Sequence, residues 1–322
     1  MKIRLQVTSC RSQVSCRKLE ARAFSTRNLQ PATFNLHSAF SLIEVLVVSS
    51  LLILIVLGLL AVFDRTQQAF TASMTQTDVL QGGRGAMDLI ASDLEQMTPS
   101  FGVSNGAVNF YAAVPANYTP LTNTLPGSVQ IRTNVLEDLF VLTRQNLSGV
   151  DSWVGIGYAV DTSQNGVSPS APFDPLYRFA TNCPVATNPV SLFNAFYNAV
   201  VFSDSITNSG SHLMDGVVDL RARAYDANGV WMTNTYAFYA NQTTTNPNVQ
   251  FPPPAWGETG FYMYSNMLPA TVEVELGVLE AGALQRAESL LTPTNYLAQQ
   301  AGRVHLFRRR VLIRNLDPAA YQ

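Results

Sequence analysis

Apolar and polar residues alternate unevenly along this chain, and the longest apolar run covers residues 40–63, FSLIEVLVVSSLLILIVLGLLAVF. As an α-helix with ~1.5 Å rise per residue it would reach about 36 Å, enough to cross a bilayer core of ~30 Å. The run is longer than the apolar core of a secretory signal peptide, ~7–15 residues, and no Ala-x-Ala cleavage site follows it. We therefore expect a transmembrane helix that persists in the mature protein.

Residues 64–98 are more polar but keep a helical period, which predicts that the same helix continues as an amphipathic half. Its apolar positions are Phe70, Met74, Leu80, Met87, Ile90, Leu94 and Met97. This stripe is expected to pack on a sheet, and Pro99 is expected to end the helix. The run Gly82–Gly85 (GGRG) weakens helical structure by ~0.8–1.0 kcal/mol per glycine relative to alanine, which predicts a kink, a local unwinding or a short loop between two helices.

Residues 99–322 are predicted to form a β-rich globular domain. Residues 100–128 are rich in Pro, Asn, Thr and Gly, which is typical of a connecting loop. Strand-like runs follow at Asp138–Arg144, Trp153–Val160, Leu176–Thr181, Ala199–Ser203, Val217–Tyr225, Val230–Ala240, Ala270–Leu279 and Arg303–Arg314. Thr271–Leu276 alternates most clearly, with both glutamates on one face. Asp226–Gly229 predicts a hairpin turn, Ala283–Leu291 a short helix and Asn241–Pro254 a linker.

The charge pattern adds an orientation. Charged residues make up only 13% of the chain, about half of the ~25% usual in globular proteins. Residues 1–39 hold seven basic residues against Glu20, a net charge of +6, while the remainder holds 13 arginines against 21 acids, a net charge of −8. Under the positive-inside rule we expect the N-terminus in the cytoplasm and an acidic extracytoplasmic domain. An acidic domain gives no reason to expect nucleic-acid binding.

Few residues suggest catalytic or metal chemistry, so no catalytic residue, metal site or cofactor is expected. Cys183 is the only cysteine beyond the apolar run, and the nucleophile-elbow, phosphate-loop and HExxH motifs do not occur. Four weaker candidates for functional sites have structural explanations that are at least as good. They are a Ca²⁺ loop at Asp215, Asp219, Asp226 and Asn228, a pair His212/His305, a partner-binding patch at Arg308–Arg310, and a recognition surface in the aromatic segment Phe251–Tyr264.

Glu44 is the unusual residue of the apolar run, because a carboxylate at the centre of a transmembrane helix costs ~2.5–3.5 kcal/mol and less near an end. The sequence around it, Ala39-Phe40-Ser41-Leu42-Ile43-Glu44-Val45, resembles the type III signal of type IV prepilins and pseudopilins. The resemblance implies that a prepilin peptidase cuts between Ala39 and Phe40 and N-methylates Phe40, and that Glu44 serves in assembly. The family usually has Gly before the cut, and Ala39 keeps the small size that the site requires.

Later landmarks narrow the resemblance to the J-type minor pseudopilins of type II secretion and the W-type minor pilins. They are Gly85–Leu94, Tyr158, Leu176–Arg178, Val218–Asp226, Gly229–Trp231, Leu268–Val274 and Phe307–Val311. The chain is also similar to the prepilin-like cassette protein C group of Verrucomicrobia. The fold that this implies is α+β and type IV pilin-like, with one long N-terminal helix, transmembrane and then amphipathic, packed on a mainly antiparallel sheet.

The resemblance implies a non-enzymatic minor subunit of a type II secretion pseudopilus or type IV pilus, acting in a tip or initiation complex. Its expected location is the inner membrane, crossed once, with residues 1–39 removed as a cytoplasmic leader. Its expected partners are the prepilin peptidase, other pilins or pseudopilins and membrane lipid. The alternative is a periplasmic binding or catalytic domain that uses the pilin-type signal only as an anchor.

Overall fold

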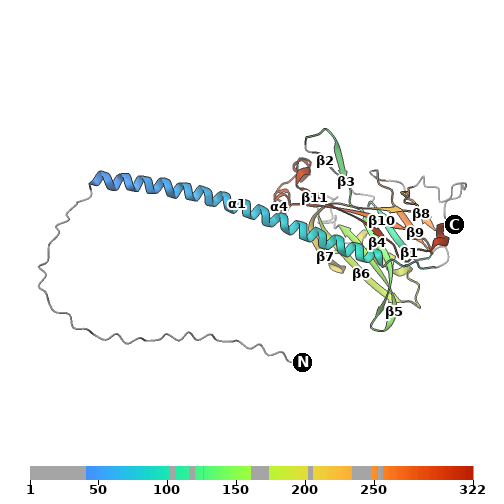
Figure 1. Ribbon diagram of the computed structural model, residues 1–322. Coiled ribbons are helices and arrows are strands. Elements are labelled where there is room, and N and C mark those ends of the chain that lie inside the picture. The colour runs from blue at the N-terminus through green and yellow to red at the C-terminus, as the bar shows by residue number, and fades with distance from the viewer. Residues whose placement is uncertain are drawn as a thin grey trace, which may run out of the picture. The chain divides into compact units, whose positions relative to one another are not determined.

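One long helix and one large antiparallel sheet account for most of the helix and strand residues that the structure describes, so the protein has an α+β fold (Figure 1). The computed structural model describes residues 41–101, 106–115, 120–125, 127–160, 174–201, 206–233, 248–252, 255 and 257–321. The helices are α1 (Leu42–Glu95), α2 (Val190–Val201), α3 (Ile206–Ser209), α4 (Ala281–Glu288) and α5 (Pro293–Leu297), with 3₁₀ turns η1 (Ala301–Arg303) and η2 (Pro318–Tyr321). The strands are β1 (Val108–Ala113), β2 (Leu121–Thr124), β3 (Ile131–Asn134), β4 (Asp138–Leu147), β5 (Val150–Val160), β6 (Asp174–Pro184), β7 (Gly210–Tyr225), β8 (Val249–Gln250), β9 (Phe261–Tyr264), β10 (Thr271–Leu279) and β11 (Val304–Leu312).

The chain divides into two units, Met1–Ala61 and Val62–Gln322. Within the described part, the first unit consists of the apolar start of α1, and α1 continues without a break into the second unit. The second unit contains the whole sheet and the rest of the helix. The predicted leader, residues 1–39, lies outside the described residues.

The sheet has nine strands in the order β11-β10-β7-β6-β5-β4-β1-β9-β8, and every pairing in it is antiparallel. A separate two-stranded ribbon pairs β2 with β3. Six of the predicted strand runs are confirmed: they correspond to β4, β5, β6, β7, β10 and β11. The alternation in β10 is also confirmed, because Val272 and Val274 are fully buried while Glu273 lies on the other face.

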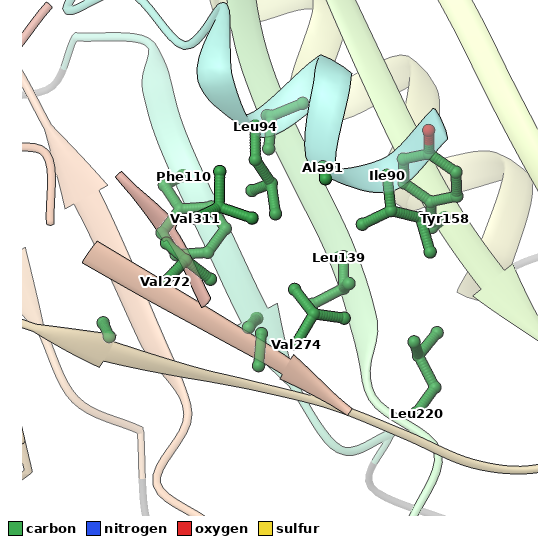
Figure 2. Close-up of a cluster of buried hydrophobic side chains, with 14 of the residues drawn as sticks. Ile90, Ala91, Leu94, Phe110, Leu139, Tyr158, Leu220, Val272, Val274 and Val311 are labelled. Carbon is green, nitrogen blue, oxygen red and sulfur yellow. The ribbon is translucent and has the colours of Figure 1, made fainter. Parts of the chain in front are cut away.

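The C-terminal part of α1 packs on one face of this sheet, and Figure 2 shows Ile90, Ala91 and Leu94 pointing toward core residues of several strands. These three helical side chains are at most 2% exposed. The strand residues in the same buried cluster include Phe110, Leu139, Tyr158, Leu220, Val272, Val274 and Val311. The expected stripe was too long, however. Phe70 and Met74 are exposed, and burial of the helix starts near Val79.

The glycine-rich run in α1 does not interrupt the helix, so the predicted local unwinding or loop is wrong, while the predicted kink stays a prediction. Its role is close packing. A Cβ atom on Gly83 would lie 2.2 Å from Cε2 of Phe307 on β11. The absence of a side chain at Gly83 therefore lets the helix and the edge of the sheet approach each other, and this contact offsets the low helix propensity of glycine. The helix ends at Glu95, earlier than the expected residue 98, and Met97 forms a bridge to Thr143 of β4.

The second face of the sheet carries α2, which corrects the prediction of a strand at Ala199–Ser203. Residues up to Val201 are helical, because Leu192, Phe196 and Ala199 recur at helical spacing and are buried in one cluster. Phe196 packs against Gly157 of β5, where a Cβ atom would lie 2.2 Å from its ring. Phe140 of β4 and Phe179 of β6, the strands on either side of β5, pack their rings against Phe196 in the same cluster.

Three further expectations have different outcomes. Residues 100–128 were predicted as a loop but contain β1, in the sheet, and β2. The composition concealed β1 because its six residues are framed by loop-forming residues, although Phe110 and Tyr111 point into opposite core clusters as strand neighbours do. The Asp226–Gly229 turn is confirmed by the bond from Gly229 N–H to the Asp226 carbonyl and by a bridge between Tyr225 and Trp231. Of the strand expected at Val230–Ala240, only that bridge is present among residues 230–233; residues 234–240, like most of Asn241–Pro254, lie outside the described ranges.

Substitution of two glycines of the same helix separates packing from propensity. Gly83→Ala should lower the melting temperature of the detergent-solubilised chain, because the new methyl group collides with the Phe307 ring. Gly85→Ala meets no atom within 4 Å. It should raise the melting temperature by ~2–4 °C, which corresponds to about 1 kcal/mol of helix propensity in a domain of this size. Equal shifts in the same direction for the two variants would contradict the packing role of Gly83.

Candidate functional site

The first half of α1 presents an apolar surface with no protein covering it among the described residues. Leu42 is 83% exposed, and the exposed fractions of the Leu, Ile and Val side chains as far as Val62 stay at 44% or more. Residues 42–63 would reach about 33 Å as a helix. This is the one helix in the described part of the chain that is long and apolar enough to cross a membrane, by length and composition. A surface of this kind needs lipid or other helices around it.

The polar groups inside this apolar half are satisfied by the helix itself, with one exception. The hydroxyls of Ser49 and Ser50 donate to the carbonyls of Leu46 and Val47, at 2.9 and 2.8 Å. Such back-bonding lets a hydroxyl lie in an apolar medium. The Glu44 carboxylate, in contrast, has no hydrogen bond or ion pair with any residue that the structure describes. It is the single charged side chain between residues 42 and 63.

Glu44 lies in the first turn of α1, one turn after Ser41. The Glu44 amide donates to the Ser41 carbonyl at 2.9 Å and to the Ser41 hydroxyl at 3.3 Å, so Ser41 caps the helix. Acidic side chains are favoured in a first turn because the helix dipole is positive there. The predicted cleavage residues, Ala39 and Phe40, lie outside the described residues. The structure thus places Glu44 at the end of the apolar surface, and the cut site and N-methylation stay predictions.

A buried polar group fixes the other half of α1 to the sheet, and the sequence patterns did not reveal it. The Asp93 carboxylate accepts the Tyr158 hydroxyl, the Arg178 Nε–H at 2.9 Å and an Arg178 Nη2–H at 3.2 Å. Burial disfavours the charge of Arg178, but the hydrogen bond and charge of Asp93 outweigh it and raise the pKa of the guanidinium. Burial, reinforced by the neighbouring Asp93, raises the pKa of the Tyr158 phenol, which stays a donor. The three side chains come from α1, β5 and β6, and they lock the helix to the sheet.

The weaker sequence candidates have structural roles where the structure describes them. Asp226 accepts the amides of Asn228 and Val230 at 2.9 and 2.7 Å and so closes its own turn, while Asp219 is fully buried in an ion network. No group of three His, Cys, Asp or Glu residues within the described ranges is placed to hold a metal ion. The weaker candidate, a calcium loop, is therefore not assembled by these residues.

The two histidines are also separate from each other. His212 contacts Asp215 at 2.7 Å, and His305 contacts Glu280 at 3.0 Å. In the aromatic segment, Phe261 and Met263 are core residues, whereas Tyr262 and Tyr264 lie in the cluster on the α2 face. Parts of this segment, at residues 253, 254 and 256, lie outside the described residues.

The arginine triplet of β11 divides between the two faces of the sheet. Arg309 lies on the α1 side and forms an ion pair with Asp88. Arg308 and Arg310 lie on the opposite face and contact Glu275 and Glu273 of β10 at 2.7 and 3.1 Å. The triplet is thus part of an edge strand, which agrees with the structural role considered for it. The other interpretation, a partner-binding patch, stays a prediction.

An ion network continues from that edge across β10 and β7. Arg221 contacts Asp219 at 2.7 Å and Glu258 at 2.6 Å, and Arg223 also reaches Glu258, at 2.8 Å. From the β2–β3 ribbon, Arg132 reaches Asp219 at 2.8 Å and Glu275. Some ion pairs of this network join residues that are remote in the sequence; Arg132 and Glu275, for example, lie 143 positions apart. Period-two patterns locate such residues on a face, but they cannot predict which remote charges meet.

No protein-family model matches this chain, and no curated protein and no solved structure is significantly similar to it.

Two neighbouring carboxyl groups make the stability of the domain sensitive to pH. Burial raises the pKa of Asp138 to about 8 and that of Glu137 also to about 8, although the Ala222 amide, which donates to Glu137, opposes the second shift. In the unfolded chain both groups titrate near pH ~4. The folded state therefore holds more protons between pH ~4 and ~8, and its stability should fall as the pH rises through this window.

Replacing Asp138 tests this dependence. Asp138→Asn should remove roughly half of the decrease in melting temperature between pH 5 and pH 8, because one of the two titrating groups is lost. The control is Asp151→Asn. Hydrogen bonds from Asn146 and Arg144 lower the pKa of Asp151. Its contribution to stability is therefore lost only on acidification below this window, and its replacement should not change the slope between pH 5 and pH 8. Thermal melts of the detergent-solubilised chain give the answer, and an Asp138→Asn slope equal to that of wild type would refute the assignment.

Proposed function

We propose that this chain is a minor pilin or pseudopilin: a single-pass membrane protein that becomes a subunit of a type II secretion pseudopilus or type IV pilus. The observation that carries the proposal is the division of α1. Its first half exposes apolar side chains all round and carries one carboxylate near its start, while its second half packs into an antiparallel sheet. A helix of this kind anchors the domain and also offers it a way to assemble.

The electrostatics of Glu44 connect anchoring to assembly. Cleavage before Phe40 creates an amine four residues upstream of Glu44. In a bundle of such helices, the carboxylate of one subunit pairs with the amine of a neighbour, which removes the cost of an unpaired charge in an apolar medium. The signal-like sequence Ala39–Val45 supports this proposal, and so does the absence of an internal partner for Glu44 among the described residues.

The proposal extends to place and partners. The basic residues of segment 1–39 favour a cytoplasmic N-terminus, with the sheet domain on the outer side of the inner membrane. The prepilin peptidase would then process the chain and N-methylate Phe40, and other pilins or pseudopilins would surround it at a filament tip or initiation complex. We expect no catalytic role for the sheet domain. The alternative, a binding or catalytic domain that is merely anchored, differs in requiring no contact between the helices of neighbouring chains.

The mature protein should begin at Phe40. In cells with an active prepilin peptidase, intact-mass measurement of the membrane-extracted chain should show the loss of residues 1–39 and the added mass of one methyl group. The control is Ala39→Leu, whose larger side chain should leave the precursor uncut. A full-length wild-type chain in those cells would argue against the prepilin assignment.

Glu44→Ala should block entry into filaments but not membrane insertion or cleavage. Insertion should be at least as good, because the helix becomes more apolar. The neighbouring amine would lose its partner, and leaving one member of a buried ion pair alone typically costs ~3–5 kcal/mol, which lowers assembly by roughly two to three orders of magnitude. Membrane fractionation, processing and sheared filaments should be compared with wild type.

Ser49→Ala is the matched control, because among the described residues that hydroxyl bonds only to its own helix, at the Leu46 carbonyl. It should assemble like wild type. A Glu44→Ala chain that is processed and enters filaments at the wild-type level would favour the anchored-domain alternative.

A further inference from the structure

The edge strand β11 offers a pairing surface that lies outside the apolar helix. It is the terminal strand of the sheet, nine residues long, and in the part of the chain that the structure describes it pairs only with β10. The opposite end of the sheet is the two-residue strand β8. Long edges invite the addition of another strand, because their outer N–H and C=O groups have no partner in the sheet.

Two hydrogen bonds at the ends of β11 establish which of its backbone groups point outward. The Ile313 amide donates to the Ala270 carbonyl, and the Glu280 amide donates to the Arg303 carbonyl, both at 3.0 Å. Since antiparallel pairing alternates, the odd-numbered residues of β11 bond inward to β10. The outward N–H and C=O groups therefore belong to Leu306, Arg308, Arg310 and Leu312, and to Val304, whose N–H already bonds to the Ala301 carbonyl.

The side chains at these outward positions share one face, opposite α1, and most of them are accessible. Leu306 is 48% and Leu312 is 73% exposed, and they flank two arginines whose side chains are 57% and 58% exposed. On the inner side, β10 already places a carboxylate opposite each arginine: Glu275 lies opposite Arg308 and Glu273 lies opposite Arg310. Each arginine keeps more than half of its side chain in solvent, where a second carboxylate can reach it.

The same arginines disfavour pairing between two copies of this edge. Antiparallel pairing centred on Arg309 would place Arg308 of each copy opposite Arg310 of the other, and parallel in-register pairing would place each arginine beside its equivalent. Like charges directly opposite each other destabilise a strand pair. In these two registers the edge therefore favours a strand of opposite charge over a second copy of itself.

We propose that β11 docks an extended acidic segment of a different protein chain, which adds to the sheet as a further strand. Its carboxylates, two residues apart, lie beside Arg308 and Arg310, and apolar residues outside them pack on Leu306 and Leu312. The backbone bonds supply affinity and the alternating side chains supply selectivity. This proposal does not rest on assembly through α1.

The test uses the full chain in detergent micelles and short fluorescent peptides. The first peptide has the capped sequence of Thr271–Leu279, TVEVELGVL, which already pairs with β11 from the inner side. The second replaces both glutamates by lysine, and the third has the same composition with the glutamates adjacent. By fluorescence anisotropy the first peptide should bind at least about tenfold more tightly than either of the others, a difference of ~1.4 kcal/mol.

Variants then separate backbone pairing from charge. Leu306→Pro removes one outward N–H and no bond to β10, a change that edge strands tolerate, and it should abolish binding. Arg308→Gln with Arg310→Gln should weaken binding about tenfold or more and reduce its salt dependence. Leu291→Ser, at a fully exposed site outside β11, should bind like wild type. Thermal melts check folding, and Leu312→Pro replaces Leu306→Pro if that chain does not fold.

Three outcomes would overturn the proposal. The acidic peptide does not bind, it binds Leu306→Pro and wild type equally, or the lysine peptide binds as tightly as the acidic one. Self-association of the full chain that Leu306→Pro abolishes would also overturn it, because the occupant would then be a second copy. Loss of filament assembly in the Glu44→Ala chain bears only on the proposed function.

Discussion

The packing of α1 on the sheet is the contact on which the rest of the molecule depends. Ile90, Ala91 and Leu94 fill the space above the central strands, and Gly83 lets the helix come close to the Phe307 ring at the sheet edge. The same helix has another half that no described residue covers. One helix thus carries two surfaces with different requirements: an exposed apolar surface in its first half and a surface packed in the core of the domain in its second half.

The sheet has apolar regions that helices cover and a charged region near its β11 edge. The α1 face and the α2 face are apolar where a helix covers them, whereas the region of β7, β10 and β11 opposite α1 carries alternating arginines and carboxylates. Ion pairs of this kind add little stability when solvent reaches them. In the proposed docking at β11 their main effect is on specificity, since like charges disfavour one partner strand and opposite charges favour another.

The sequence was a good guide where the relevant force is local. The apolar run, the alternation of β10 and the Asn-Gly turn follow from periodicity and backbone preference, and the structure has all three. It was a poor guide where a distant residue decides. Gly83 was interpreted as a helix breaker because nothing nearby reveals Phe307, and Ala199 was assigned to a strand because its apolar neighbours suit either element. For the site, the sequence singled out Glu44 by its setting, but the link between Asp93, Tyr158 and Arg178 depends on the three-dimensional fold.

That link has an evolutionary consequence. Asp93, Tyr158 and Arg178 come from three separate elements and satisfy one another in a buried place. A change at Asp93 alone would leave the guanidinium without its counter-charge, and a change at Arg178 alone would leave a buried carboxylate with one donor. Single substitutions at these positions should therefore be removed by selection, so that in diverging lineages the three residues are either retained together or exchanged together for an apolar set.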